Sequence, residues 1–306
     1  MLSGEKLENK NILRKCPLDM EVSLNYNEQN GGFAMKKVIF TVTVVLLLVA
    51  FGVSAFLVGS YLIESKEQKD KYDDLASQVE SARGTTAATE PSQTTNPSGD
   101  TKPSKPAATE PSMIPEYKEI YEKNSDTVGW IRIDGTKVNY PVVQHQGLDE
   151  KGQEFYLYRD FDKKDSKAGT IFVKDNVDVN EPSDNIVLYG HNMANGSMFA
   201  ALNAYTNKAA WERNSLIFFD TLNEYHTYKI FAVFKTSANL GEGFAYHNFV
   251  DAKDEAEFDA FIAEAKNLSF YDTGITPKYG DKIIMLSTCE YTLDNGRLVV
   301  AAYRIS

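Results

Sequence analysis

The chain has 306 residues, of which 42% are hydrophobic and 25% charged, enough for one substantial folded domain with accessory segments or two small domains. Its formal net charge of −11 argues against a nucleic-acid-binding protein, which would present a basic face. Two cysteines, Cys16 and Cys289, are too few for a disulfide framework or a thiolate metal site, and the four histidines lack metal-ligand spacing. We therefore expect no metal ion and no nucleic-acid partner.

Residues 38–63 form an uncharged, mostly apolar run, longer than the roughly 20 residues that cross a bilayer core. Lys36 and Lys37 precede it, which predicts a single-pass topology with the N-terminus inside and the C-terminus outside. The alternative is a cleaved signal peptide, because Val53-Ser54-Ala55 resembles a small-residue cleavage site. Since cleavage there would leave an apolar stretch exposed, we favour an uncleaved signal anchor.

The segments on either side of this run differ in character. Residues 1–37 are predicted to be a cytoplasmic tail; Met35 is itself a suitable start, which leaves open whether residues 1–34 are translated. Residues 64–83 are charged with apolar positions at helical spacing, which predicts a juxtamembrane helix. Residues 84–113 are rich in proline, threonine and serine, and this composition predicts a disordered linker.

Short β-rich runs dominate residues 114–306, with turn signals such as Asp134-Gly135 between them. Helical patterns occur at Glu116–Lys123, Ser197–Tyr205 and Glu255–Lys266. Strands at this spacing favour a barrel or sandwich with helical insertions. The expected strands are Val128–Ile133, Val138–Val143, Gly169–Val173, Ile186–His191, Leu216–Asp220, Tyr225–Thr236, Lys282–Cys289 and Leu298–Ile305.

Three polar side chains stand at the ends of predicted strands. Cys289 ends an apolar strand and Arg297 begins the next, so an open antiparallel loop over 290–296 would place them opposite each other, with Cβ atoms about 5 Å apart. A guanidinium beside the sulfur favours thiolate and can bind an oxyanion. His191 follows a strand and the flexible Gly190, so its ring can be presented to a cleft.

Each of these residues also has an ordinary structural interpretation. Asn295-Gly296 is a tight-turn signal, and a two-residue hairpin there would pair Cys289 with residue 302 and move Arg297 roughly 16 Å along its strand. Taken singly, Cys289 fits an inert buried thiol, His191 a surface or capping histidine, and Arg297 a solvated charge. Spacing alone therefore stops at an extracytoplasmic β-rich domain with one thiol on its side of the membrane.

Several blocks of the sequence resemble class B sortases, a family of cysteine transpeptidases. Leu286-Ser287-Thr288-Cys289 is similar to the signature Thr-Leu-x-Thr-Cys, with Met285 at the position of the first threonine. Tyr189-Gly190-His191-Asn192, followed by Asn195-Gly196-Ser197-Met198-Phe199, resembles the family's histidine segment, and Arg297 falls at its arginine. The other similar blocks are residues 126–131, 140–144 and 167–172, so the resemblance covers about residues 115–306 in order.

This resemblance implies both a fold and a set of site residues. The family fold is an eight-stranded β-barrel with peripheral helices, and the helix at Glu255–Lys266 also suits class B. Its chemistry implies that Cys289 is the nucleophile, that His191 is the acid and base, and that Arg297 stabilises the oxyanion. The positions that match the family's substrate groove are Tyr189, Ser287 and Glu290.

The reaction implied by the resemblance is cleavage of a C-terminal sorting signal after a threonine. Cys289 would hold the secreted protein as a thioester and pass it to a peptidoglycan-precursor amine of a Gram-positive cell wall, without any cofactor. One alternative is a pilin-polymerising sortase with a lysine acceptor, and another is a membrane-anchored binding domain whose three residues are idle. A papain-like peptidase fits less well, because such chains place the cysteine before the histidine and at a helix start.

Overall fold

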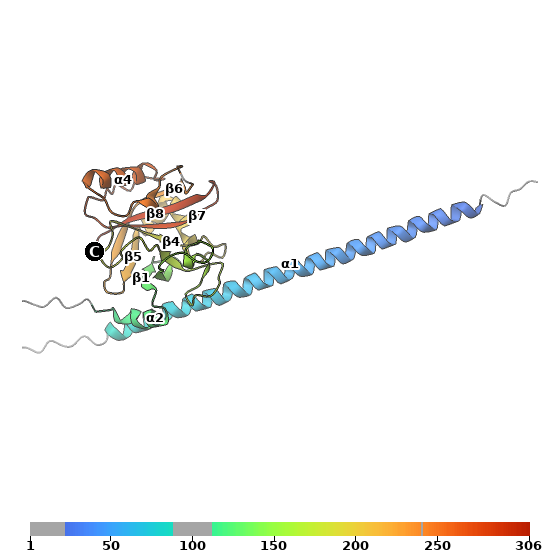
Figure 1. Cartoon of the computed structure of the whole chain (residues 1–306), viewed down its shortest axis with the longest axis horizontal. Coiled ribbons are helices and arrows are strands. Elements are labelled where there is room, and N and C mark those ends of the chain that lie inside the picture. The colour runs from blue at the N-terminus through green and yellow to red at the C-terminus, as the bar shows by residue number, and fades with distance from the viewer. Residues whose placement is uncertain (1–21, 88–111, 240) are drawn as a thin grey trace, which may run out of the picture. The chain divides into compact units, whose positions relative to one another are not determined.

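The computed structural model describes residues 22–87, 112–239 and 241–306 (Figure 1). The chain divides into two compact units, Met1–Glu64 and Ser65–Ser306. Cys16, with most of the predicted cytoplasmic tail, and most of the predicted linker lie outside the described residues. The predicted segment boundaries after residues 37, 63, 83 and 113 stay predictions.

A single long helix, α1 (Val22–Ala87), contains the apolar run. In the described chain, its part Met35–Gly84 is the one helical stretch that is long and apolar enough to cross a membrane, judged by length and composition. The large side chains of its apolar run, residues 38–63, are open to solvent in the protein alone: Phe40, Phe51 and Phe56 are each at least 70% exposed. Water is an unfavourable environment for such a surface, and a bilayer core is a favourable one.

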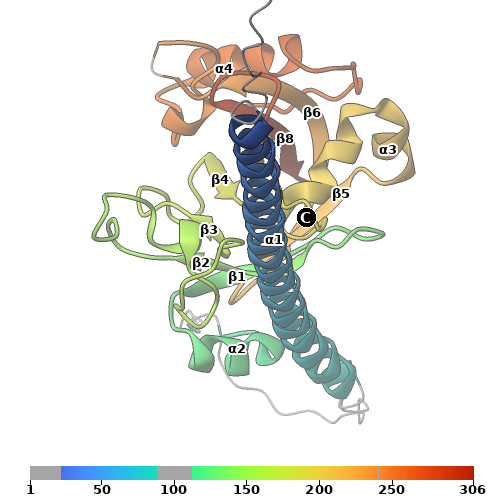
Figure 2. The same cartoon turned by 90° about the vertical axis from the view of Figure 1, so that its right-hand side faces the viewer.

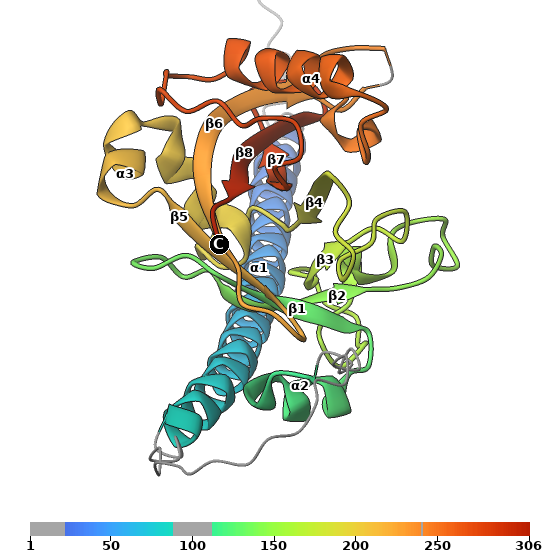
Figure 3. The same cartoon turned by 90° about the vertical axis from the view of Figure 1, so that its left-hand side faces the viewer.

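The second unit is built on a closed barrel of eight strands (Figure 3), as the resemblance to class B sortases implied. Its order is β1-β2-β3-β4-β7-β8-β6-β5, and the sheet is mixed because the pairs β2–β3 and β4–β7 are parallel. Each predicted strand region overlaps one strand. The strands are β1 (Thr127–Arg132), β2 (Asn139–Gln144), β3 (Ile171–Val173), β4 (Asn185–Tyr189), β5 (Leu216–Thr221), β6 (Thr227–Ser237), β7 (Ile283–Glu290) and β8 (Gly296–Arg304).

The predicted hairpin at Asp134-Gly135 joins β1 to β2, which pair antiparallel. Gly135 adopts a φ of +73°, a left-handed conformation that glycine reaches without a steric penalty. The amide of Ile133 donates to the carbonyl of Val138 at 2.9 Å and closes the hairpin. The turn residues thus set the register of the first two strands.

Alternation along the strands separates two apolar faces. One face fills the barrel, with side chains from all eight strands, and over β6, β7 and β8 the other is covered by α4 (Glu255–Asn267). Figure 3 shows α4 lying across the side of the barrel formed by β6, β7 and β8. Asp254 caps this helix by accepting the amide of Glu257 at 2.9 Å. The residues beneath or on α4 include Val187, Met285, Val299, Ala301, Phe258, Phe261, Ile262 and Ala265.

The shorter helices differ more from prediction. The predicted helix Ser197–Tyr205 is the 3₁₀ helix η3 (Phe199–Thr206), which begins after Met198 at a φ of +53°. The amides of Met198 and Phe199 donate to the Tyr140 hydroxyl and the His191 carbonyl, so tertiary partners take up the donors at its start. The other short helices are η1 (Pro115–Tyr117), α2 (Lys118–Lys123), η2 (Phe155–Tyr158), α3 (Lys208–Arg213) and η4 (Tyr246–Asn248).

The part of α1 inside the second unit, residues 65–84, lies against the barrel beside α2 and β1 (Figure 2). Tyr72, Leu75 and Val79 are 3%, 4% and 1% exposed and belong to the barrel's main core cluster. Their spacing of three and four residues puts them on one face of the helix. The sequence predicted that spacing, but it did not predict that the barrel itself covers this face.

Candidate active site

The ends of β4 and β7 bring His191 and Cys289 to the same edge of the sheet. These strands are parallel neighbours, and Tyr189 pairs with Ser287. His191 and Cys289 each stand two residues beyond that pair. In β7, residues two apart point to the same face, so Cys289 shares the face of Met285, which is covered by α4.

Two hydrogen bonds fasten these strand ends together. The amide of Gly190 donates to the carbonyl of Ser287 at 3.1 Å, and Nδ2 of Asn192 donates to the carbonyl of Cys289 at 3.0 Å. Gly190 is required by space, because a Cβ there would lie 2.8 Å from the ring of Phe199. Backbone contacts on both sides of His191 therefore hold its position relative to β7.

β8 supplies the third residue, Arg297, and pairs with β7 in the register expected for an open loop over residues 290–296. β7 and β8 are antiparallel, with Cys289 opposite Arg297 and Glu290 opposite Gly296. The alternative two-residue hairpin is wrong: Asn295 does turn, with a φ of +46°, but it does so at the base of a longer loop. Opposed residues of an antiparallel pair have Cβ atoms about 5 Å apart on one face.

The guanidinium of Arg297 is braced against the loop base. Its Nη1 donates to the carbonyls of Asn295 at 3.2 Å and Gly296 at 2.9 Å. Within the described residues, Nε and Nη2 have no hydrogen-bond partner in the protein. The side chain thus keeps planar donors that could bind an oxygen beside Cys289.

His191 is half-buried, and its ring orientation is fixed from one side. Its Nε2 lies 2.7 Å from the carbonyl oxygen of Leu157, and its ring lies 5.4 Å from that of Tyr158 between centroids. A carbonyl oxygen only accepts, so Nε2 carries hydrogen and Nδ1 is the nitrogen that gains and loses the mobile proton. Burial lowers the pKa of His191, and the bond to Leu157 offsets part of this effect.

We predict that His191 titrates below the ordinary histidine value of about 6.5. The unfolded chain then binds this proton more readily than the folded protein, so the contribution of His191 to stability falls as the pH drops through 6.5. ¹⁵N NMR of histidine-labelled protein, with His191→Gln to assign the signal, measures the midpoint. A midpoint at or above 6.5 would contradict the buried environment.

Cys289 is half-buried and is the one free cysteine of the described chain. Burial raises the pKa of the Tyr246 and Tyr291 hydroxyls, and a charge on the Cys289 sulfur raises both further. Tyr291 also donates from its hydroxyl to the carbonyl of Asn192 at 3.3 Å. This bond joins the loop that follows Cys289 to the residue that follows His191.

Two of the positions predicted to contact substrate lie on the same strands as the candidate site. Tyr189 stacks on Phe172 with centroids 5.3 Å apart, and burial raises the pKa of its hydroxyl. Ser287 is 2% exposed, and its hydroxyl lies 2.6 Å from that of Tyr246. These contacts place both residues beside the site, and their role in substrate binding stays a prediction.

The contacts of the third position, Glu290, favour a structural role. Its carboxylate accepts from Nζ of Lys235 at 2.7 Å, from the hydroxyl and amide of Thr292 at 2.7 and 3.0 Å, and from the amide of Leu293 at 3.1 Å. Burial alone would raise its pKa, but these donors lower the pKa to about 2. Glu290 thus holds the start of the loop between Cys289 and Arg297.

Glu290→Gln is expected to lower the stability of the protein by about 1–3 kcal/mol at pH 7, because a buried charged acceptor is lost. The carboxylate's pKa is depressed on folding, so its contribution is present above about pH 4.5 and is lost as the pH falls toward 2. Thermal unfolding from pH 7 to pH 3 should show the two proteins converging at low pH. Asp294→Asn in the same loop is the control, and an equal loss for both variants would contradict this role.

Sequence reasoning missed three contributors to the site. The carbonyl of Leu157, the amide of Asn192 and the hydroxyl of Tyr246 each contact a predicted site residue. Asn192 stood in the motif with His191, so its presence was visible although its bond to Cys289 was not. The role of a backbone carbonyl such as that of Leu157 cannot be predicted from a sequence, because every residue type has one.

Comparison with known proteins agrees with this architecture. Residues 131–305 match the Sortase domain family. The chain is 29% identical over 261 residues to sortase B of Listeria monocytogenes, covering 83% of this chain and 93% of the relative. It is 30% identical over 194 residues to sortase B of Staphylococcus aureus, covering 61% and 74%. The structure of a Staphylococcus aureus sortase B–substrate complex shares the fold, with a TM-score of 0.65 and 24% identity over 80% of this chain and 99% of that one.

The chain therefore belongs to the sortase family, whose members are cysteine transpeptidases. Both curated relatives are class B enzymes, and they place the chain in that class. The family resemblance of the sequence motifs is thereby confirmed.

Proposed function

We propose that Cys289, His191 and Arg297 are the catalytic residues of this transpeptidase. The observation that carries the proposal is the strand register: Cys289 pairs with Arg297 on one side, and the segment bearing His191 is hydrogen-bonded to the backbone of Cys289 on the other. A nucleophile, an oxyanion donor and a proton carrier thus come from three adjacent strand ends. Rigid strands hold such groups more precisely than mobile loops do.

In the first step, the thiolate of Cys289 forms a bond to the carbonyl carbon that follows a threonine in the sorting signal. The carbonyl π electrons move to oxygen, and Arg297 stabilises the resulting oxyanion. When this intermediate collapses, the C–N bond breaks and the leaving amine takes a proton from Nδ1 of His191. The product is a thioester on Cys289, with Nδ1 left neutral.

In the second step, a primary amine attacks the thioester carbon. Neutral Nδ1 of His191 accepts the proton of the amine, and the sulfur leaves as thiolate. One amide bond has been broken and one formed, so the transfer needs no nucleotide. The hydrogen bond from Nε2 to the Leu157 carbonyl keeps the hydrogen on Nε2 throughout. Nδ1 is therefore the nitrogen that transfers the proton in both steps.

The proposed setting is the outer face of a membrane. The apolar helix supports an N-terminal anchor, and Lys36 and Lys37 support a cytoplasmic N-terminus with the barrel outside. The proposed substrates are secreted proteins with a C-terminal sorting signal, of an Asn-Pro-x-Thr or similar type. The proposed acceptor is an amine of a peptidoglycan precursor.

The test uses the full-length chain in detergent micelles with a library of sorting-signal peptides. Peptidoglycan-precursor amines and a lysine peptide of the pilin type are offered as competing acceptors. Mass spectrometry should find the peptide joined to the precursor amine and, without acceptor, an acyl group on Cys289. Preference for the lysine peptide would replace the acceptor proposed here, and absence of any acyl group on Cys289 would overturn the mechanism.

A further inference from the structure

Building on the proposed function, we infer that Tyr72 is a positioning residue for His191. It belongs to residues 65–84 of α1, called here the docked segment, which lies outside the barrel and far from Cys289 in the sequence. Tyr72 acts on His191 through two separate sets of contacts. One reaches the carbonyl that holds the imidazole, and the other reaches the backbone turn that follows it.

The first set runs through the hydroxyl of Tyr72. It donates to the carbonyl of Gly169 at 3.0 Å and lies 3.1 Å from the hydroxyl of Thr170. Gly169 has a φ of +58°, and a Cβ there would lie 2.5 Å from the carbonyl oxygen of Leu157, so the two backbones are in direct contact. That same oxygen accepts the hydrogen on Nε2 of His191 at 2.7 Å.

Thr170 secures this contact from the other side. Its amide donates to the carbonyl of Tyr156 at 3.2 Å, and its hydroxyl donates to the carbonyl of Arg159 at 2.9 Å. These two acceptors flank Leu157 in the sequence. The hydroxyl of Tyr72 therefore helps to fix the short turn that presents the Leu157 carbonyl.

The second set runs through the ring of Tyr72. The ring packs edge-on against Tyr140, with centroids 5.3 Å apart at 85°. The hydroxyl of Tyr140 accepts the amide of Met198 at 3.1 Å, and the amide of Phe199 donates to the carbonyl of His191 at 3.0 Å. The ring thus supports the segment that carries His191, while the hydroxyl supports the acceptor of its imidazole.

Other residues of the docked segment contact the same two regions. The side-chain amide of Asn195, four residues beyond His191, donates to the hydroxyl of Ser65 at 2.6 Å. Gln68 donates to the hydroxyl of Ser166 in the segment that leads from Leu157 to Gly169. Several residues of the docked segment therefore contact the turn that presents the Leu157 carbonyl or the segment that follows His191.

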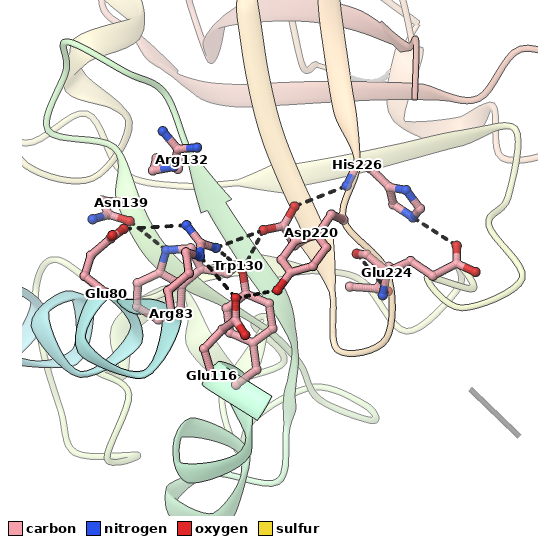
Figure 4. Close-up of polar contacts among 12 residues, drawn as sticks. Glu80, Arg83, Glu116, Trp130, Arg132, Asn139, Asp220, Glu224 and His226 are labelled. Carbon is pink, nitrogen blue, oxygen red and sulfur yellow. Dashed lines mark hydrogen bonds and ion pairs between the residues drawn. The ribbon is translucent and has the colours of Figure 1, made fainter. Parts of the chain in front are cut away.

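Charged contacts hold the docked segment in place. Near its start, Nζ of Lys71 lies 2.5 Å from Asp160 and 2.7 Å from Asp162. Near its end, Arg83 reaches Glu116 at 3.1 Å and Asp220 at 3.3 Å (Figure 4). The carboxylate side chains of Glu116 and Asp220 are 1% and 9% exposed, so removing Arg83 would leave buried charge without this partner.

The inference is tested with Tyr72→Phe in the full-length protein, which keeps the ring and removes the hydroxyl. We expect kcat for thioester formation to fall about 10- to 100-fold, with KM changed less than about twofold, because a small displacement of a catalytic group has a large effect on rate. Tyr279→Phe, at an exposed tyrosine beside α4, is the matched control and should keep wild-type kcat. Unchanged kcat in Tyr72→Phe would overturn the inference.

A spectroscopic measurement separates positioning from loss of stability. In histidine-labelled protein, the hydrogen on Nε2 of His191 should exchange with solvent slowly in the wild type. It should exchange rapidly in Tyr72→Ser and at an intermediate rate in Tyr72→Phe. A fall in kcat without faster exchange would overturn the positioning role. If the wild-type protein forms no acyl group on Cys289, the proposed function fails, while the exchange measurement still decides whether Tyr72 controls His191.

Discussion

Cys289→Ala is expected to abolish both cleavage of the sorting signal and capture of the acyl group, with a loss of at least about 10³-fold in kcat. The physical reason is that alanine offers no nucleophile, while the neighbouring donors cannot form the thioester alone. Peptide cleavage followed by chromatography, with intact mass of the enzyme, measures both outcomes.

Cys16→Ala is the matched control for this variant, since it removes the chain's other thiol and should leave turnover unchanged. The thermal midpoint of Cys289→Ala should stay within a few degrees of wild type, because a half-buried thiol loses little packing. Turnover by Cys289→Ala at more than a few per cent of the wild-type rate would contradict the assignment of the nucleophile.

Arg297→Ala is expected to lower kcat by about 10²- to 10³-fold, which is the usual effect of losing one oxyanion donor. Arg297→Lys should recover only part of this loss. Lysine keeps the charge but lacks the planar donors that could span the loop carbonyls and the substrate oxygen at once. Steady-state kinetics with a single sorting-signal peptide measure the effect.

Arg304→Ala provides the control, because Arg304 ends the same strand, β8, that Arg297 enters. Its kcat should stay close to wild type. If Arg297→Ala instead raised KM and left kcat unchanged, Arg297 would bind the peptide equally in the ground and transition states, and its oxyanion role would be rejected.

The strands and the apolar face of α4 could be predicted from the sequence because each depends on local periodicity. Phe258 and Ile262 lie on one face of α4, and Asp134-Gly135 makes the expected turn, without reference to distant residues. The loop between Cys289 and Arg297 was different. Its tight-turn signal at Asn295-Gly296 is real, and the choice between two registers rested on chemistry and not on propensity.

Other features of the site could not be found from the sequence. Asn192 and Cys289 are joined by a hydrogen bond across 97 positions, and such contacts follow from the parallel pairing of β4 with β7. Tyr72 showed helical spacing with Leu75 and Val79, which indicates an apolar face but not what covers it. The acceptor for His191 is a main-chain oxygen, which any residue type could supply.

The closed barrel has a consequence for how clients are chosen. Every strand already has two hydrogen-bonded neighbours, so the barrel offers no edge to which an incoming polypeptide could add as a further strand. Binding through strand addition is tolerant of sequence, because it reads main-chain groups. An enzyme without that route must tell its substrates apart by their side chains, which fits the proposed role of modifying a few exported polypeptides among many.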